Sequence, residues 1–181
     1  MPRIAPNSNP DPKAQELLDD VKKLLGGTPN VFTTLAHSPA ALGVFVNALG
    51  AMSNSRLGAA LREQISVTVA GASGCDYCAS AHTALGAMHK IDAGELTRNL
   101  QAHSANGRVE AGLAFARTVV ERRGRVSDAE LEAIRRAGYS DGEIIDIVAL
   151  VAVNLLTNYV NQIAGTEIDF PVVTTSEVAV A

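Results

Sequence analysis

The stretch Glu63-Gln-Ile-Ser-Val-Thr-Val-Ala-Gly-Ala-Ser-Gly-Cys-Asp-Tyr-Cys-Ala-Ser-Ala-His82 contains both cysteines of the 181-residue chain. Its glycines predict a break between two helices, with Cys75 opening the second helix. Successive helical residues rotate by about 100°, so Cys75, Cys78 and His82 fall on one helix face. The spacing therefore predicts two thiols within disulfide reach and an imidazole one turn beyond the second thiol.

These residue types suit thiol redox chemistry. A thiol is a good nucleophile only as the thiolate, and both the first turn of a helix and a nearby imidazolium favour that form. Cys75 gains the first effect, and Cys78 gains some of both. A Cys-x-x-Cys pair can cycle between dithiol and disulfide, because one sulfur attacks and the other resolves. If the helix of Glu63 packs beside the cysteine helix, this carboxylate orients His82 or accepts its proton.

Two simpler interpretations compete with redox chemistry. Cysteines are often ordinary small core residues, but here the only two lie three residues apart with a histidine at i+4. A structural zinc site needs four ligands, usually from two such pairs, and the chain has one pair with His82 and Glu63 as the only extra candidates. We therefore expect neither a metal nor a cofactor.

The four residues Glu63, Cys75, Cys78 and His82 give the chain a resemblance to a known family. At these spacings they resemble the active-site signature of the AhpD-like alkylhydroperoxidases, which belong to the larger carboxymuconolactone decarboxylase family. The similarity extends over residues 28–171, and its closing part resembles a subgroup often labelled only as peroxidase-related.

In one position the chain departs from the family pattern. The best-studied members carry a second histidine directly before the second cysteine, where this chain has Tyr77. The resemblance implies a thiol peroxidase acting on a small organic hydroperoxide or hydrogen peroxide. It also implies a trimer or hexamer, and re-reduction by a lipoyl-type or thioredoxin-like dithiol. We expect a simpler or slower proton relay because the second histidine is missing.

Two considerations disagree about which cysteine sulfur attacks the peroxide. Thioredoxin-type logic favours Cys75, because it starts the helix and is usually more exposed. The resemblance favours Cys78, with Glu63 and His82 relaying its proton, and the i+4 spacing of His82 supports the same choice. We predict Cys78 as the attacking sulfur and Cys75 as the resolving one.

Two alternative functions remain open at this stage. The first is a disulfide carrier or redox sensor with little peroxidase turnover, which the missing histidine favours. The second is a lactone decarboxylase or isomerase, as some relatives are, although those relatives lack the cysteine pair.

Composition narrows the classes of function. The net charge is −4 without a basic cluster, which disfavours a nucleic-acid partner. A single Cys-x-x-Cys pair fits a reducing cytosol better than a secreted disulfide scaffold, and the proline-rich start has no apolar segment typical of a signal peptide. We expect a cytoplasmic protein with no membrane association.

The chain reads as one all-α domain of about eight or nine helices with short connections. Residues 1–11 are expected to form an irregular arm and residues 169–181 an extended tail, on either side of a helical domain at 12–168. Both ends are expected to lie on neighbouring subunits. Cap-then-proline pairs at Asp11, Thr28 and Ser38, and capping boxes at 92–95, 127–130 and 140–143, predict helix starts. The expected helices lie near 12–25, 29–37, 39–52, 57–72, 75–90, 92–101, 107–123, 127–137 and 141–164.

The helix predicted at 141–164 is apolar enough to suggest burial on nearly all sides, including burial by partner subunits in a homo-oligomer. Its polar interruptions argue against a membrane span, which needs about 20 apolar residues. Asn154, Asn158 and Asn161 share one face. We interpret them mainly as hydrogen-bonded packing at a helix or subunit interface, with substrate contact as the alternative. The histidines at 37 and 89 are interpreted as a packing group and a solvated group.

Overall fold

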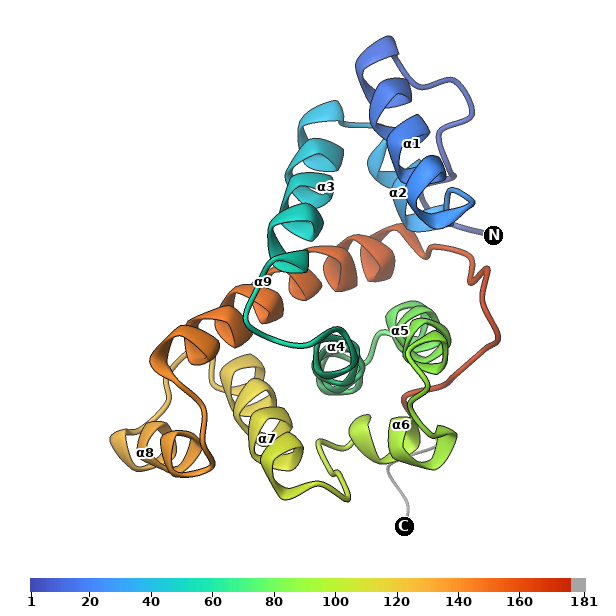
Figure 1. The fold of residues 1–181 in the computed structure, drawn as a ribbon. Coiled ribbons are helices and arrows are strands. Elements are labelled where there is room, and N and C mark those ends of the chain that lie inside the picture. The colour runs from blue at the N-terminus through green and yellow to red at the C-terminus, as the bar shows by residue number, and fades with distance from the viewer. Residues whose placement is uncertain (177–181) are drawn as a thin grey trace.

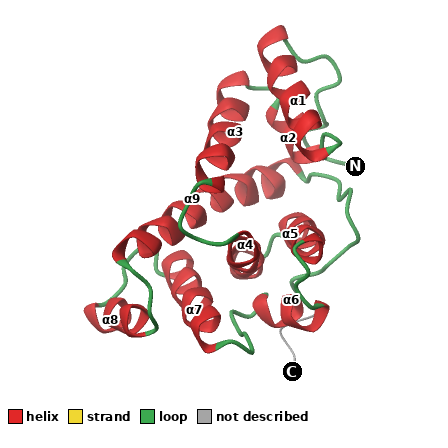
Figure 2. Ribbon diagram, viewed as in Figure 1, coloured by secondary structure: helices red, strands yellow, loops and turns green. Residues whose placement is uncertain are grey.

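The computed structural model describes residues 1–176, and within that range it contains nine helices and no strand (Figure 2). The predicted all-α class is confirmed. In Figure 1, α4 lies at the centre of the lower part of the molecule, with α5, α6, α7 and α9 around it, while α1, α2 and α3 lie on the opposite, upper side of α9. The helices are α1 (Pro12–Leu25), α2 (Asn30–Leu35), α3 (Pro39–Ser53), α4 (Ala59–Ser73), α5 (Asp76–Met88), α6 (Ala93–Asn99), α7 (Gly107–Glu121), α8 (Asp128–Arg136) and α9 (Asp141–Ala164).

Local side-chain caps start several helices where the sequence predicts them. Asp11 and Ser38 accept first-turn N–H groups of α1 and α3. The serine capping boxes of α8 and α9, at Ser127 and Ser140, are both complete. These starts are set by residues adjacent in the sequence, because a side-chain oxygen satisfies an N–H that has no partner inside the helix.

The start of α2 differs from the prediction, because Thr28 does not cap it. Its first N–H groups find distant partners instead. The N–H of Asn30 donates to Oδ2 of Asp169 at 2.9 Å, and the N–H of Val31 donates to the hydroxyl of Tyr77 at 3.1 Å. A helix of six residues is too short to be stable alone, so α2 depends on α5 and the chain end for its cap.

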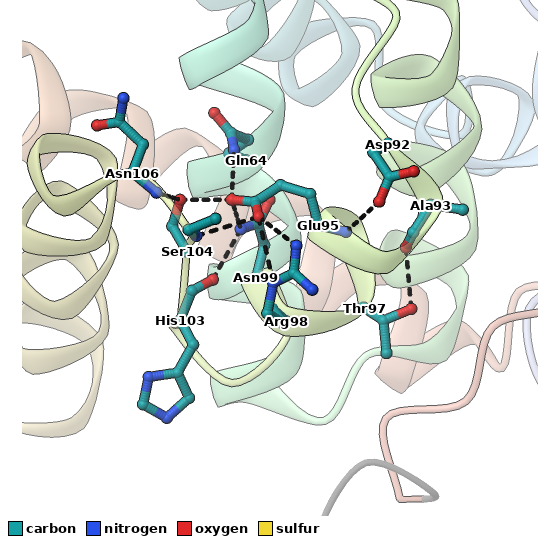
Figure 3. Close-up of polar contacts among 11 residues, drawn as sticks. Gln64, Asp92, Ala93, Glu95, Thr97, Arg98, Asn99, His103, Ser104 and Asn106 are labelled. Atoms are coloured by element: carbon teal, nitrogen blue, oxygen red, sulfur yellow. Dashed lines mark hydrogen bonds and ion pairs between the residues drawn. The ribbon is translucent and has the colours of Figure 1, made fainter.

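The capping box predicted at Asp92 is also only half formed. Asp92 accepts the N–H of Glu95, but the carboxylate of Glu95 does not return to Asp92. Figure 3 shows that it points into a polar cluster instead. The donors to this carboxylate are the hydroxyl of Ser104, the N–H of Ala105, and the side chains of Arg98, Asn99 and Gln64.

These donors determine the charge state of Glu95. Burial by itself raises the pKa of this carboxyl, but the hydrogen bonds outweigh burial and lower the pKa to about 2. The ionised carboxylate thereby joins α6 and the loop before α7 to Gln64 of α4. Gln64 is the immediate neighbour of Glu63, so the cluster helps to fix the part of α4 that carries the candidate site.

The central position of α4 follows from its burial on all sides. Seven consecutive residues, 64–70, are buried, which no helix with a solvent face allows. Gly71 permits a further close approach, because a Cβ at this position would collide with the backbone carbonyl of Leu100. Gly74 then ends α4 in the left-handed conformation, with φ of 65°. The chain turns there and enters α5.

In the single chain α9 is buried on one face only, so the predicted burial on nearly all sides depends on partner subunits and stays a prediction. One face packs on the core through residues such as Ile147 and Val151. The other face exposes a row of apolar side chains, namely Ile145, Val148, Tyr159 and Ile163. By length and composition α9 is the one described helix that could span a membrane, but its asparagines hydrogen-bond to α4 and α5 as in a core helix.

Both ends of the described chain lie on the chain's own helices, where sequence analysis suggested a neighbouring subunit. The backbone N–H groups of Arg3 and Ile4 donate to the carbonyl of Ala164 at the end of α9. Past α9, the segment 169–176 runs beside α5. Figure 1 shows this segment as part of the red loop at the right. It pairs Val173 with Ser80 and Thr175 with Asp76. The rest of the predicted tail, 177–181, lies outside the described residues.

Candidate active site

A disulfide at the start of α5 joins the two cysteines, whose Cα atoms are 5.3 Å apart. Cys75 is the N-cap residue of α5, so the helix itself begins at Asp76, one position later than predicted. Through its sulfur, Cys75 accepts the N–H of Cys78 at 3.3 Å. Its own N–H donates back to the carbonyl of Ala70 in α4. Both sulfurs therefore lie where unpaired helix N–H groups favour negative charge.

The two cysteines are equally hidden from solvent. Cys75 is 2% exposed and Cys78 is 3% exposed. The expectation that Cys75 is the more exposed sulfur is therefore wrong. Cys75 lies at the turn between two packed helices, and its side chain belongs to the same buried apolar cluster as that of Cys78. Exposure gives no reason to prefer either sulfur as the attacking one.

Glu63 and His82 meet across the α4–α5 contact. Oε2 of Glu63 lies 2.8 Å from Nδ1 of His82, and their side chains are 17% and 21% exposed. A carboxylate at this distance fixes the imidazole ring and takes the Nδ1 proton as its hydrogen-bond partner. The other ring nitrogen, Nε2, is then left to give or accept a proton. Since His82 follows Cys78 by one helical turn, the pair stands beside the second cysteine, as the spacing predicts.

Asn161 contributes a contact that sequence analysis did not assign to the site. Its Nδ2 donates to Sγ of Cys78 at 3.4 Å, and the residue is 4% exposed. The other two asparagines on this face of α9 do pack as predicted, because Asn154 donates to Ser66 and Asn158 donates to the carbonyl of Val69. The i, i+4, i+7 pattern was the available signal, but it does not tell which neighbour each amide meets.

Tyr77, which stands where the resemblance implies a second histidine, contacts α2 and the segment after α9. Its hydroxyl accepts the N–H of Val31, and its ring packs edge-on against Phe170 with 5.9 Å between centroids. Burial raises the pKa of Tyr77 far above its ordinary value, and the nearby carboxylate of Asp169 raises it further. The phenol therefore stays protonated. Tyr77 packs α5 against α2 and against the segment after α9 that carries Asp169 and Phe170.

The remaining histidines named by sequence analysis lie apart from the cysteines. Nε2 of His37 is 2.9 Å from the carbonyl of Ala5 in the N-terminal arm. His89 is exposed at the C-terminal end of α5. Within residues 1–176, no group of three or more His, Cys, Asp or Glu side chains is arranged to hold a metal ion.

One protein-family model matches the part of the chain that carries the predicted site residues. Residues 39–118, which include all four predicted site residues, match the model of the carboxymuconolactone decarboxylase family. A solved structure from Ralstonia eutropha JMP134, described as an alkylhydroperoxidase AhpD core and a peroxidase-related protein, is 27% identical to this chain. The two proteins match over 93% of each chain with a TM-score of 0.81. The chain is similar to AhpD-like proteins and, over residues 39–118, to the carboxymuconolactone decarboxylase family. The resemblance drawn from the sequence is thus confirmed.

Two further solved structures share the fold at lower identity. A peroxidase-related protein from Silicibacter sp. TM1040 is 24% identical, with 91% of each chain matched and a TM-score of 0.78. The debrominase Bmp8, solved as a cysteine-to-alanine variant with 2,3,4-tribromopyrrole, is 19% identical over 92% of this chain and 91% of its own, also with a TM-score of 0.78. No curated protein matches the sequence. Since one protein of this fold is a debrominase, the fold alone does not fix the substrate.

Proposed function

We propose that this protein is a thiol-dependent peroxidase that reduces a small hydroperoxide with its cysteine pair. The observation that carries the proposal is the Glu63–His82 pair, held one helical turn from a Cys-x-x-Cys disulfide. A bare redox switch needs only the two sulfurs, whereas a peroxidase also needs a proton for the departing oxygen. The oriented imidazole supplies such a proton.

The proposed reaction has two steps within the protein. The thiolate of Cys78 attacks the terminal oxygen of the hydroperoxide, the O–O bond breaks, and His82 gives its proton to the departing alkoxide. Cys78 is now a sulfenic acid and the product is an alcohol, or water when the substrate is hydrogen peroxide. The sulfur of Cys75 then attacks the sulfenic sulfur and releases water, which forms the 75–78 disulfide.

The choice of Cys78 as the attacking sulfur rests on its neighbours. Cys78 has His82 one turn away and an amide donor from Asn161 at 3.4 Å. Cys75 instead accepts a backbone N–H at the helix start, which favours its thiolate but provides no proton for the departing alkoxide. Glu63 acts through His82, because it contacts the imidazole.

An external dithiol of the lipoyl or thioredoxin type is proposed to return the disulfide to the dithiol. The pair of cysteines without others in the chain fits a reducing cytoplasm, which we propose as the location. Since both cysteines are at most 3% exposed, a protein-borne reductant has to displace part of the apolar cover around α5 before it reaches their sulfurs.

We also propose that the protein forms a homo-oligomer through the exposed face of α9. Ile145 is 66% exposed and Ile163 is 60% exposed at opposite ends of one long helix. Several large apolar side chains exposed on one face of a helix commonly mark a protein interface. The family resemblance supports a trimer or hexamer.

A disulfide carrier or redox sensor remains the second candidate, and the burial of both sulfurs together with the inert Tyr77 favours it. Titration of free thiols before and after one equivalent of peroxide separates the candidates. A peroxidase loses both thiols within the mixing time and regains them repeatedly when dithiol is supplied. A slow carrier exchanges disulfides with a dithiol but leaves peroxide unconsumed, and that result would refute the proposal.

The lactone decarboxylase alternative is tested by the same protein with both cysteines alkylated. A peroxidase is then inactive toward every substrate, because both reacting sulfurs are blocked. Turnover of a lactone by the alkylated protein would instead favour decarboxylase or isomerase chemistry.

A further inference from the structure

The side chain of Asn161 is held against Cys78 from a separate helix. It lies near the end of α9, where its carbonyl accepts the N–H groups of Gly165 and Thr166. This capped end fixes the backbone that carries the amide. Nδ2 then reaches Sγ of Cys78 at 3.4 Å in a setting that is 4% exposed.

Both polar atoms of the Asn161 side-chain amide are poorly hydrogen-bonded. Its nitrogen donates to sulfur, which is a weak acceptor in a thiol or disulfide. Its oxygen is buried and has no partner within the described residues, and such a group costs stability. Packing alone therefore gives little reason for an asparagine here. A thiolate, in contrast, is a charged acceptor, and hydrogen bonds to charged groups are roughly twice as strong as neutral ones.

The titratable groups around Cys78 come from three segments. On α5 these are Cys75, His82 and Tyr77, on α4 it is Glu63 paired with His82, and next to Tyr77 it is Asp169. His82 loses its stabilising charge once it has given its proton away. The amide of Asn161 is a donor at every pH, so its effect on the sulfur does not depend on the protonation of the imidazole.

We propose that Asn161 is a further catalytic residue, whose side-chain amide stabilises the thiolate of Cys78. The assignment rests on the proposed function only in naming Cys78 as the attacking sulfur. The thiolate itself can be measured without peroxide, through the pH dependence of alkylation. Failure of the peroxidase proposal can therefore be distinguished from failure of this one.

The test uses the Cys75→Ser variant, in which Cys78 is the only thiol of the chain. The rate of iodoacetamide alkylation is followed against pH, and the midpoint is compared after adding Asn161→Ala or Asn161→Asp. Loss of a hydrogen bond to a charged group moves the midpoint up by about one to two pH units. Asn161→Asp keeps the shape of the side chain and places a carboxylate at the sulfur, so its midpoint rises at least as far.

Asn154→Ala is the matched control. It removes another buried amide from the same face of α9, one that donates to Ser66 and to the carbonyl of Leu150 and contacts no cysteine. Its alkylation midpoint is expected to stay unchanged even if the protein becomes less stable. Circular dichroism and thermal unfolding establish which variants are folded.

The outcomes are distinct. A raised midpoint in both folded Asn161 variants, with the control unchanged, supports the proposal, whether or not peroxide oxidises the protein. An unchanged midpoint in the folded Asn161→Asp variant overturns it, even if Asn161→Ala does not fold. Equal shifts in the Asn161 variants and in Asn154→Ala also overturn it, because they indicate a general loosening of α9.

Discussion

Glu95→Gln is expected to destabilise the protein in a pH-dependent way. The folded-state pKa of Glu95 is about 2, against an ordinary value of 4.5. The difference of about 2.5 units, at about 1.4 kcal/mol per unit, corresponds to roughly 3 kcal/mol of stability supplied by the ionised carboxylate. Because the folded pKa is lowered, this stability is fully present above pH 4.5 and is lost as the pH falls from about 4.5 to about 2.

The measurement is urea unfolding followed by circular dichroism at pH 7, 5, 4 and 3, at one fixed protein concentration. At pH 7 the free energy of unfolding of Glu95→Gln is expected to lie about 3 kcal/mol below that of the parent. The gap narrows at pH 4 and further at pH 3, because the parent then loses its advantage by binding a proton to Glu95. Asn99 and Ser104 donate to the carboxylate in Figure 3. Their hydrogen bonds become poorer both when Glu95 is replaced by Gln and when it is protonated.

Glu132→Gln is the control for a general effect of removing a negative charge. Glu132 is 53% exposed, and its carboxylate is 4.0 Å from Arg135, so the change is expected to stay within about 0.5 kcal/mol at every pH. A gap for Glu95→Gln that is as large at pH 3 as at pH 7 would contradict the charge argument. The loss of stability would then come from poor packing of the glutamine side chain and not from the lost negative charge.

Three further predictions concern the site and the surface. His82→Ala is expected to slow oxidation of Cys78 by peroxide at neutral pH by about tenfold or more. The rate recovers only partly at high pH, because the thiolate then forms without help but the departing oxygen still lacks its proton. Stopped-flow kinetics that match the parent at all pH values would rule out the relay. Cys75→Ser is expected to react once with peroxide and leave a sulfenic acid that a dimedone probe traps, whereas Cys78→Ser does not react; the reverse pattern would make Cys75 the attacking sulfur. Ile145→Asp is expected to dissociate a folded oligomer in sedimentation, whereas the fully buried Ile147→Asp unfolds the chain; a parent protein that sediments as a monomer at micromolar concentration would refute the interface on α9.

Much of the site could be predicted because its geometry is local. Cys75, Cys78 and His82 lie within two helical turns, so the helix period alone sets their common face. The glycine at position 74 marks the end of α4 because few other residues adopt its left-handed conformation readily. Helix starts with their own caps, as at Ser127 and Ser140, were likewise readable from the sequence.

Partners far apart in the chain could not be read in the same way. The sequence places Asn161 on a face with two other asparagines, but only the crossing of α9 over α5 brings its amide to Cys78. The same limit explains the errors at Thr28 and Glu95. In each case a local capping partner competes with donors or acceptors supplied by a distant segment, and the distant segment prevails in the folded chain.

The sequence by itself determined the helical class, the helix order and the redox pair with its adjacent histidine, because helix periodicity and short-range caps act over a few residues. The tertiary structure alone decided that Glu63 meets His82, that both cysteines are buried and that the hydroxyl of Tyr77 contacts α2. These contacts depend on how α4, α5 and α9 pack together. That packing is fixed by the burial of many side chains at once, which no short pattern of residues encodes.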